Sequence, residues 1–115
     1  MSPPLVYVIV LNYNASDWLE SCLQTLTTTD YENFKVLFID NASTDSSIRL
    51  VKRRFPGIEV IANQVNLGFS AGNNIGINVA LSRSADYVVL LNPDTKIKPN
   101  WLKEVVRVGE MTSEI

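Results

Sequence analysis

The run LVYVIVL at residues 5–11, followed at once by the polar turn Asn12-Tyr13-Asn14, decides the fold. Seven consecutive apolar residues, three of them valine, are typical of a parallel β-strand that is covered on both faces. The run is too short to span a membrane, and no basic segment precedes it as in a signal peptide. The sequence therefore predicts a buried strand that carries polar residues at its carboxyl end.

Three further apolar runs predict strands at Phe34–Ile39, Ile58–Ile61 and Tyr87–Leu91. Four helical patterns alternate with the strands. The first has a buried stripe, and in the second Ser43 or Thr44 is the candidate cap. The third runs from about Phe69 to Ser82, and the fourth begins near Pro99. The apolar positions that define the first, second and fourth helices are Trp18, Leu19, Cys22, Leu23 and Leu26; Ile48, Val51 and Phe55; and Trp101, Leu102, Val105 and Val106.

Alternation of strands and helices predicts an α/β fold of the Rossmann-like kind, with a mainly parallel sheet of about four strands and flanking helices. Residues 1–115 are expected to form a single domain. When a chain begins with alternating strands and helices of this kind, the commonest strand order in the sheet is 3-2-1-4. Ligands of such sheets bind at the carboxyl ends of the strands, where the winding direction reverses, here between the first and fourth strands.

Composition excludes several classes of function. The net charge is −2, and the basic triplet at residues 52–54 is interpreted as the solvated face of a helix, so nucleic-acid binding is not expected. The absence of histidine excludes histidine-dependent catalysis within the chain and leaves only oxygen ligands for a metal. Cys22, the single cysteine, is interpreted as a core residue. A cytoplasmic location and no membrane span are expected.

Polar segments follow three of the predicted strands directly. They are Asn12–Asn14, Asp40–Asp45 and Asn92–Thr95. Turn and cap residues are common at such places, and that is one interpretation. The other is a ligand site, because the fold brings all three segments to one edge. Asp40 then suits a ribose or base edge, although it could instead cap its own turn, whereas Asp45 fits a role at the start of the following helix.

The segment at residues 66–76 (NLGFSAGNNIG) is the fourth candidate. Gly72 and Gly76 lie on one helical stripe, although an interior glycine costs roughly 1 kcal/mol relative to alanine. The stripe predicts close approach to the sheet or to a ligand. The helix start near Gly68 offers free amides for a diphosphate. Close packing alone accounts for the glycines equally well but leaves Asn73 and Asn74 unexplained.

Two common nucleotide-binding signatures are absent. No G-x-G-x-x-G follows the first strand, and no G-x-x-x-x-G-K-[ST] occurs in the chain. Dinucleotide oxidoreductases and P-loop phosphotransferases are therefore disfavoured.

Four ordered motifs, V-I-V-L-N-Y-N, D-N-A-S-T-D, N-L-G-F-S-A-G-N-N-I-G and L-N-P-D-T, resemble the nucleotide-binding motifs of the inverting family 2 glycosyltransferases of GT-A fold. They are especially similar to those of the rhamnosyltransferase-like branch, and the resemblance extends from about Val6 to Trp101. It implies a nucleotide-sugar donor, a saccharide or lipid-linked acceptor, and a part in cell-wall or polysaccharide biosynthesis, with the parent protein at the inner face of the membrane.

The resemblance also implies roles for individual residues. The turn after the first strand and Asp40 hold the nucleoside, and the segment from Gly68 to Asn74 lies along the donor. Asp94 ends a D-x-D-type motif that holds magnesium or manganese on the donor diphosphate. Asn92 replaces the first aspartate of that motif, and Asn73 replaces a frequent arginine, so one charge and one cationic contact are missing. The implied donor-binding residues are Asn12, Tyr13, Asn14, Asp40, Asn41, Gly68, Asn73, Asn74 and Asn92, and the implied metal ligand is Asp94.

The resemblance places the catalytic base in an acidic motif beyond Ile115. No catalytic residue is expected in this chain, which is interpreted as the N-terminal donor-binding part of a longer glycosyltransferase, inactive by itself. Two alternatives are a nucleotide-binding module without catalysis and a sugar-phosphate nucleotidyltransferase. The second alternative would need a basic, glycine-rich loop after the first strand, and Asn12–Asn14 stands there instead.

Overall fold

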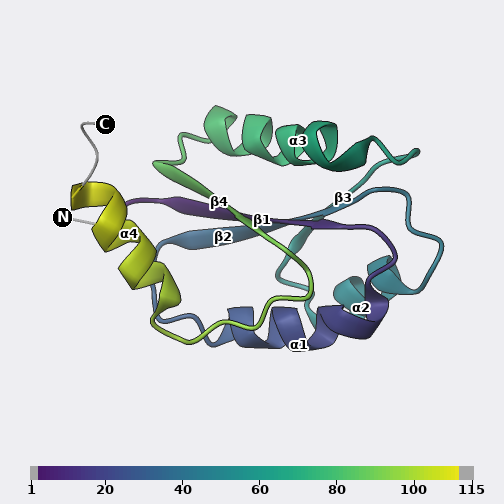
Figure 1. Cartoon of the computed structure of the whole chain (residues 1–115), viewed down its shortest axis with the longest axis horizontal. Coiled ribbons are helices and arrows are strands. Elements are labelled where there is room, and N and C mark those ends of the chain that lie inside the picture. The colour runs from purple at the N-terminus through teal and green to yellow at the C-terminus, as the bar shows by residue number, and fades with distance from the viewer. Residues whose placement is uncertain (1–2, 112–115) are drawn as a thin grey trace.

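The computed structural model describes residues 3–111, in which strands and helices alternate from the first strand to the last helix (Figure 1). This order is the one that the sequence predicts. The strands are β1 (Val6–Asn12), β2 (Phe34–Asp40), β3 (Glu59–Ala62) and β4 (Tyr87–Leu91), and the helices are α1 (Ser16–Thr27), α2 (Ser47–Arg54), α3 (Gly68–Ser82) and α4 (Trp101–Met111).

The sheet has the order β3-β2-β1-β4, and each neighbouring pair is parallel. The α/β fold class and the strand order expected from the sequence are therefore confirmed. β1 lies between β2 and β4, with Asn12 opposite Asp40 and Val10 opposite Leu91. The winding direction thus reverses at β1, where polar residues follow the strand.

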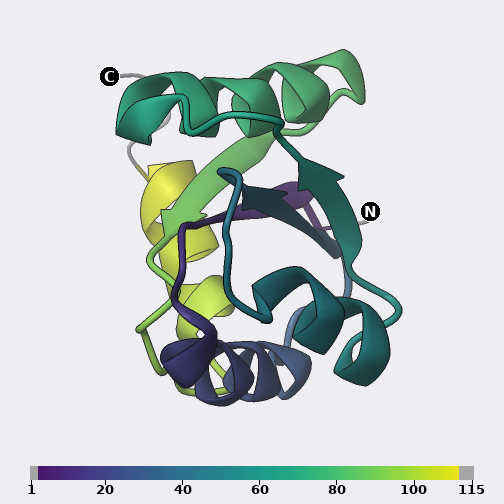
Figure 2. The same ribbon diagram turned by 90° about the vertical axis from the view of Figure 1, so that its right-hand side faces the viewer.

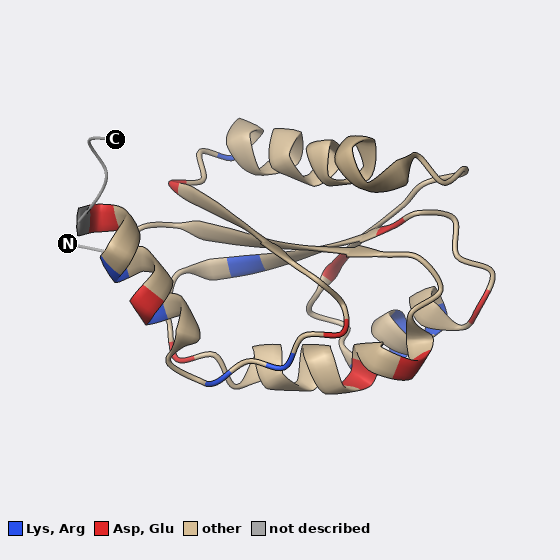
Figure 3. Cartoon of the chain, viewed as in Figure 1, with Lys and Arg blue, Asp and Glu red and all other residues tan. Residues whose placement is uncertain are grey.

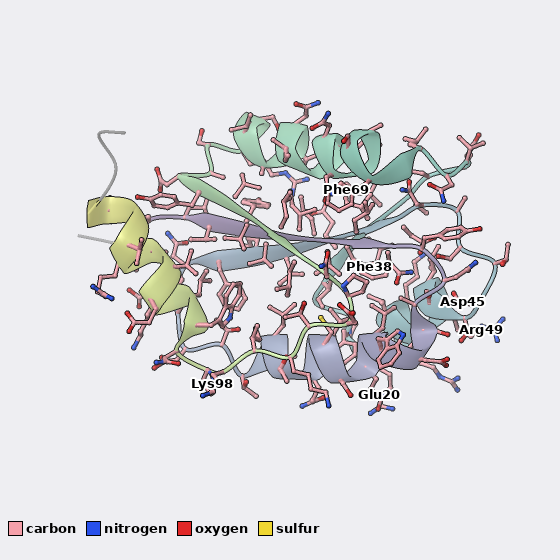
Figure 4. The ribbon with its side chains drawn as sticks, viewed as in Figure 1. Glu20, Phe38, Asp45, Arg49, Phe69 and Lys98 are labelled. Atoms are coloured by element: carbon pink, nitrogen blue, oxygen red, sulfur yellow. The ribbon has the colours of Figure 1, made fainter. Side chains whose placement is uncertain are left out.

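Helices cover both faces of the sheet (Figures 1 and 2). α3 packs on one face against Ile9 and Ile39. α1, α2 and α4 share the other face, where Phe38 points from β2 into the layer above α1 and is fully buried (Figure 4). Within residues 3–111, none of the helices combines the length and the apolar character that a bilayer crossing demands. The domain is thus a three-layer sandwich with two apolar cores.

The ends of several elements differ from the expectation. α4 begins at Trp101 rather than near Pro99, because the Pro99 carbonyl accepts a hydrogen bond of 2.7 Å from the Asp30 amide and belongs to the preceding turn. α2 begins at Ser47, and its N-cap residue makes no side-chain cap bond. Ser43 and Thr44 therefore do not cap α2, and both lie in the loop that precedes it.

Trp18 is not part of the core, although the sequence places it on the buried stripe of α1. Leu19, Cys22 and Leu23 are fully buried, whereas Trp18 is 60% exposed. The residue lies at the edge of the stripe, since Leu19 takes the position that faces the sheet. An indole is thus left on the surface near the first turn of α1.

α3 carries no charged residue (Figure 3) and packs closely against the sheet at its glycines. A Cβ atom added at Gly76 would lie 2.9 Å from both Cδ1 and Cγ2 of Ile9. A Cβ atom at Gly72 would lie 2.8 Å from Leu11 Cδ1. The glycine stripe therefore has a packing function, as one of the two interpretations of the sequence requires.

We expect Gly76→Val to lower the free energy of unfolding by about 1–3 kcal/mol, because the new side chain overpacks the contact with Ile9. The control is Gly57→Val, since no atom lies within 4 Å of a Cβ at Gly57. This control should change stability by no more than about 0.5 kcal/mol. Urea unfolding of the two variants measures the difference, and equal effects would contradict the close approach of α3.

Candidate functional site

The strand ends bring the polar segments to one edge of the sheet. Asn12 and Asp40 are register partners, and the Asn41 amide donates to the Asn12 carbonyl over 2.9 Å. The Asn63 amide continues the ladder to the Asp40 carbonyl at 2.8 Å. On the other side of β1, Asn92 directly follows Leu91, which pairs with Val10. The loops after all four strands therefore meet at the carboxyl edge.

A buried polar network joins the ends of β1 and β2. The side chains of Asn12 and Asp40 are fully buried. Asp40 Oδ1 accepts hydrogen bonds from Asn12 Nδ2 at 2.9 Å and from Ser43 Oγ at 2.7 Å, while Oδ2 accepts from the Ser43 amide at 2.8 Å. Through its bonds with Ser43, Asp40 closes the turn that follows β2.

This geometry bears on the role that the sequence predicts for Asp40. A direct contact with a nucleoside would need access to this fully buried carboxylate, although its two oxygens can accept more than the three hydrogen bonds that they receive. Only the amide nitrogen of Asn12 is committed in the same way: Nδ2 also lies 3.2 Å from Ser43 Oγ, whereas the buried Oδ1 has no hydrogen-bond partner among the described residues. Both residues thus form the base of the site, beneath the exposed turns.

A second set of bonds ties the loop after β1 to the loop after β2. Asn14, with φ of 52°, has the left-handed conformation that asparagine tolerates well. Its amide donates to Ser43 Oγ over 2.9 Å, and its Oδ1 accepts from the amides of Thr44 at 2.8 Å and Asp45 at 3.2 Å. The two loops therefore hold each other in place, and the Asn14 side chain is used in this contact.

Asp45 connects the starts of two helices. Its Oδ1 accepts from the Ser47 amide at 2.9 Å, and its Oδ2 accepts from the Ser16 amide at 3.1 Å (Asp45 in Figure 4). Desolvation acts to raise the pKa of Asp45, but the hydrogen bonds from Ser47 and Ser16 outweigh it and lower the pKa. The role at a helix start that the sequence indicates for Asp45 agrees with these contacts.

Asn41 organises the other face of the edge, towards α3. It is 2% exposed, and its Nδ2 donates to the Gly68 carbonyl over 3.0 Å. Its Oδ1 accepts from Asn63 Nδ2 at 2.9 Å and from the Leu67 amide at 3.3 Å. A Cβ atom at Gly72 would lie 2.8 Å from Asn41 Nδ2. Glycine at position 72 therefore leaves room for the side chain that anchors the start of α3.

The two asparagines of α3 differ in their surroundings. Asn73 is 4% exposed, and its Nδ2 donates to the Phe69 carbonyl one turn earlier, at 3.1 Å. Asn74 is exposed. Gly68 has φ of 84°, which glycine adopts without strain, and its amide donates to Asn66 Oδ1. Of these three residues, only Asn74 presents its side chain to solvent.

The loop after β4 presents a carboxylate to solvent. Asn92 and Asp94 are both exposed, and the Thr95 amide donates to the Asn92 carbonyl over 3.1 Å to close the turn. Beneath the turn, Cys22 Sγ lies 3.7 Å from the same carbonyl oxygen. Burial, together with the nearby Asp94 charge, raises the pKa of Cys22 to about 11, although a hydrogen bond from the Thr95 backbone lowers it. Cys22 is thus an unreactive support for the loop.

The donor atoms at this loop fit a metal that is shared with a ligand. Among residues 3–111 there is no group of three or more acidic, cysteine or histidine side chains that could hold a metal ion. One carboxylate from Asp94 and one amide oxygen from Asn92 make a weak site by themselves. Magnesium commonly binds through one or two carboxylates together with substrate phosphates. The residues therefore fit a divalent ion that arrives with a diphosphate.

Sequence reasoning missed two residues that hold the site together. Ser43 makes or receives hydrogen bonds with Asn12, Asn14 and Asp40, and Asn63 donates to Asn41. A serine three residues after an aspartate at a strand end is a known turn signal, so Ser43 was open to recognition. Asn63 had no such signal, because its contact depends on how β3 pairs with β2.

Comparison with known proteins gives a consistent result. A family model described as glycosyl transferase family 2 matches residues 7–110. An uncharacterized glycosyltransferase of Haemophilus influenzae is 31% identical over 97% of this chain and 35% of its own length. The chain also resembles two solved structures, and it spans about a third of the Haemophilus protein and of each of these two proteins.

The first of the structures is S. aureus TarS 1–349 in complex with UDP-GlcNAc, with a TM-score of 0.77 and 23% identity over 95% of this chain and 32% of that one. The second is the mannosyltransferase PcManGT from Pyrobaculum calidifontis in complex with GDP-Man and Mn²⁺. It has a TM-score of 0.68 and 26% identity over 83% of this chain and 30% of that one. At such identity the likeness to TarS establishes the fold alone.

We expect Ser43→Ala to lower the free energy of unfolding by about 1–3 kcal/mol, because buried polar groups of Asn12 and Asp40 lose a partner. The control is Ser82→Ala, which removes an exposed hydroxyl that bonds only to the Val79 carbonyl of its own helix. Urea unfolding and amide hydrogen exchange at Asn14 are the measurements. If both variants were equally stable and Asn14 kept its protection, Ser43 would not hold the two loops together.

Proposed function

The chain belongs to glycosyl transferase family 2, and from this premise we propose that it supplies the donor-binding part of an enzyme that transfers a sugar from a nucleotide diphosphate to an acceptor hydroxyl with inversion. The observation that carries the proposal is the convergence of four loops at one sheet edge, with exposed ligands above a buried polar base. The complexes of related folds with UDP-GlcNAc and GDP-Man support a nucleotide-sugar donor.

The nucleoside is assigned to the turns after β1 and β2. Tyr13 is 53% exposed at this edge, so its ring is available to a base or ribose. Asn14 and Asn41 fix the turns on either side of it through their hydrogen bonds. Asn12 and Asp40 contribute by holding these turns, and Asp40 would touch the nucleoside only if its buried carboxylate became accessible.

The diphosphate is assigned to the space between the start of α3 and the loop after β4. Gly68 and the residues of the first turn of α3 are exposed, and a helix N-terminus favours negative charge. Asn74 extends this surface, while Asn73 supports the helix from within. Asp94, with Asn92 beside it, would hold magnesium or manganese, which would stabilise the departing diphosphate when bound.

Catalysis by the whole enzyme also needs a base that takes the proton of the acceptor hydroxyl. The carboxylates at the end of β2 and in the loops after β2 and β4 are all engaged otherwise. Asp40 is buried, Asp45 accepts bonds from two helix starts, and Asp94 is assigned to the metal. We therefore assign the base to a part of the parent protein other than residues 3–111. A nucleotide-binding module without catalysis of its own is the alternative that this geometry favours for the chain alone.

We expect manganese to raise the affinity of the chain for UDP or GDP, and Asp94→Ala to abolish this increase. The physical reason is that Asp94 is the one charged ligand in the turn, so the metal bridges it to the phosphates. Calorimetric titration of UDP and GDP, with and without manganese, measures the effect. Manganese alone should bind weakly, because without nucleotide the turn offers one carboxylate.

Asp30→Ala is the matched control for this experiment. Asp30 is another exposed carboxylate, paired with Lys103 at 2.9 Å, and lies in the connection before β2, at the opposite edge of the sheet. The variant should keep the manganese dependence of the wild type. The assignment of Asp94 fails if Asp94→Ala responds to manganese as the control does, or if free manganese binds tightly and independently of nucleotide.

We expect no glycosyl transfer by residues 1–115 in isolation, because no free base is assigned to them and general-base catalysis contributes roughly 10²–10⁴-fold to a rate. The chain is incubated with panels of nucleotide sugars and acceptor sugars, and products are sought by mass spectrometry. Slow hydrolysis of the donor is compatible with the proposal. A glycoside that disappears on Asp94→Ala substitution would show that the chain is a complete enzyme.

A further inference from the structure

One stripe of α1 supports the segment that follows β4. Cys22 contacts the Asn92 carbonyl, and Thr25 Oγ1 accepts a hydrogen bond from the Ile97 amide over 3.3 Å. Beyond the helix, Thr29 Oγ1 accepts from Trp101 Nε1 over 3.0 Å. The segment runs alongside α1 towards Lys98 and α4 (Figures 1 and 4). Along α1 and the residues that follow it, Cys22, Thr25 and Thr29 thus contact Asn92, Ile97 and Trp101 in the same order.

Trp18 lies four residues before Cys22, near the N-terminal end of α1. The segment after β4 begins beside this part of the helix, since Cys22 contacts Asn92. Side chains four residues apart on a helix are neighbours on its surface. Cys22 is covered by the turn at Asn92, whereas Trp18 remains 60% exposed. Trp18 therefore lies one helical turn before Cys22, whose thiol contacts the first residue of the turn that carries Asp94.

A second observation places Asp94 close to this end of the stripe. Asp94 lies in the turn that the Thr95 amide closes on the Asn92 carbonyl, and that carbonyl oxygen is 3.7 Å from Cys22 Sγ. Cys22 is thus a common neighbour of Trp18 and of the Asp94 turn. The exposed indole thus lies one helical turn from the residue that supports the turn carrying Asp94.

We propose that the Trp18 indole forms one wall of a saccharide subsite beside Asp94, an inference that rests on the proposed function. A pyranose ring has an apolar face of C–H groups and a polar rim of hydroxyls. An exposed indole offers a flat apolar surface together with one N–H donor, which suits both parts of such a ring. The donor sugar is attached directly to the diphosphate, so a sugar whose diphosphate is held at Asp94 would reach Trp18.

The saccharide can be the donor sugar or the acceptor, because both meet at the reacting carbon. The two sources are separated by comparing a nucleoside diphosphate with its nucleotide sugar, and by adding a free glycoside to the chain loaded with nucleotide. The rest of a longer protein packing over Trp18 is the competing explanation of its exposure. That explanation predicts no dependence of sugar binding on the indole in this chain.

The experiment uses calorimetry with manganese and two matched pairs of probes, UDP with UDP-N-acetylglucosamine and GDP with GDP-mannose. Wild type is compared with Trp18→Ala, Trp18→Phe and Leu81→Ala. Leu81 is a matched control because it is also 60% exposed but lies near the end of α3. In a further arm, methyl pyranosides are titrated into each protein in the presence of manganese and the nucleoside diphosphate.

We expect Trp18→Ala to weaken binding of the nucleotide sugar, or of the pyranoside, by about three- to tenfold, the size of one aromatic contact. Affinity for the nucleoside diphosphate should stay unchanged, which also shows that the variant is folded. Trp18→Phe should restore part of the loss, and Leu81→Ala should bind as the wild type does. The arm in which the loss occurs identifies the saccharide as donor or acceptor.

Three outcomes would overturn the inference. Unchanged sugar binding by Trp18→Ala in both arms would leave the indole without a role in the subsite. An equal loss for the nucleoside diphosphate and its sugar would assign Trp18 to the nucleotide or to the fold. If the wild type bound none of the nucleotides with manganese, the proposed function would fail together with the subsite, whereas the first two outcomes leave the donor site intact.

Discussion

The buried contact between Asn12 and Asp40 is the constraint on which the rest of the site depends. Parallel pairing of β1 with β2 places the two residues opposite each other, where both side chains lose contact with water. A buried carboxylate is costly unless it is hydrogen-bonded. The chain meets this requirement with Asn12 and with the turn at Ser43. The conformation of that turn then sets the positions of Asn14 and Asp45, and through them the starts of α1 and α2.

The site therefore has two layers with different tasks. The lower layer consists of buried amides and one carboxylate whose bonds lie within the chain, and it fixes the loops. The upper layer consists of exposed groups, including Tyr13, Asn74 and Asp94, that remain available to a ligand. α3 is joined to the lower layer through Asn41, which reaches the helix start only because position 72 has no side chain. A rigid base beneath open ligands is the arrangement that preorganised binding requires.

Much of this architecture could be predicted from the sequence, because apolar runs and helical periods determine which elements form and in what order. The strand order and the edge at which Asn12, Asp40 and Asn92 gather followed from that pattern. The direction of each side chain did not follow. Asn73 bonds within its own helix, and Trp18 lies outside the core at the edge of an apolar stripe. Successive residues of a helix differ in direction by about 100°, so one of two neighbouring apolar residues can be buried while the other is exposed. Such differences depend on packing between distant elements, which periodicity in one segment does not specify.

The central claim is that the carboxyl edge of the sheet binds a nucleotide diphosphate together with a metal. NMR spectroscopy of the isotope-labelled chain tests this most directly, because manganese broadens the signals of nearby amides. With UDP or GDP and substoichiometric manganese, the account predicts broadening centred on residues 92–95, with shifts in residues 12–14, 41–44 and 66–74. Residues at the opposite edge, such as Phe34 and Ile58, should be unaffected. Broadening centred on that opposite edge, or no response to any nucleotide with manganese, would contradict the account.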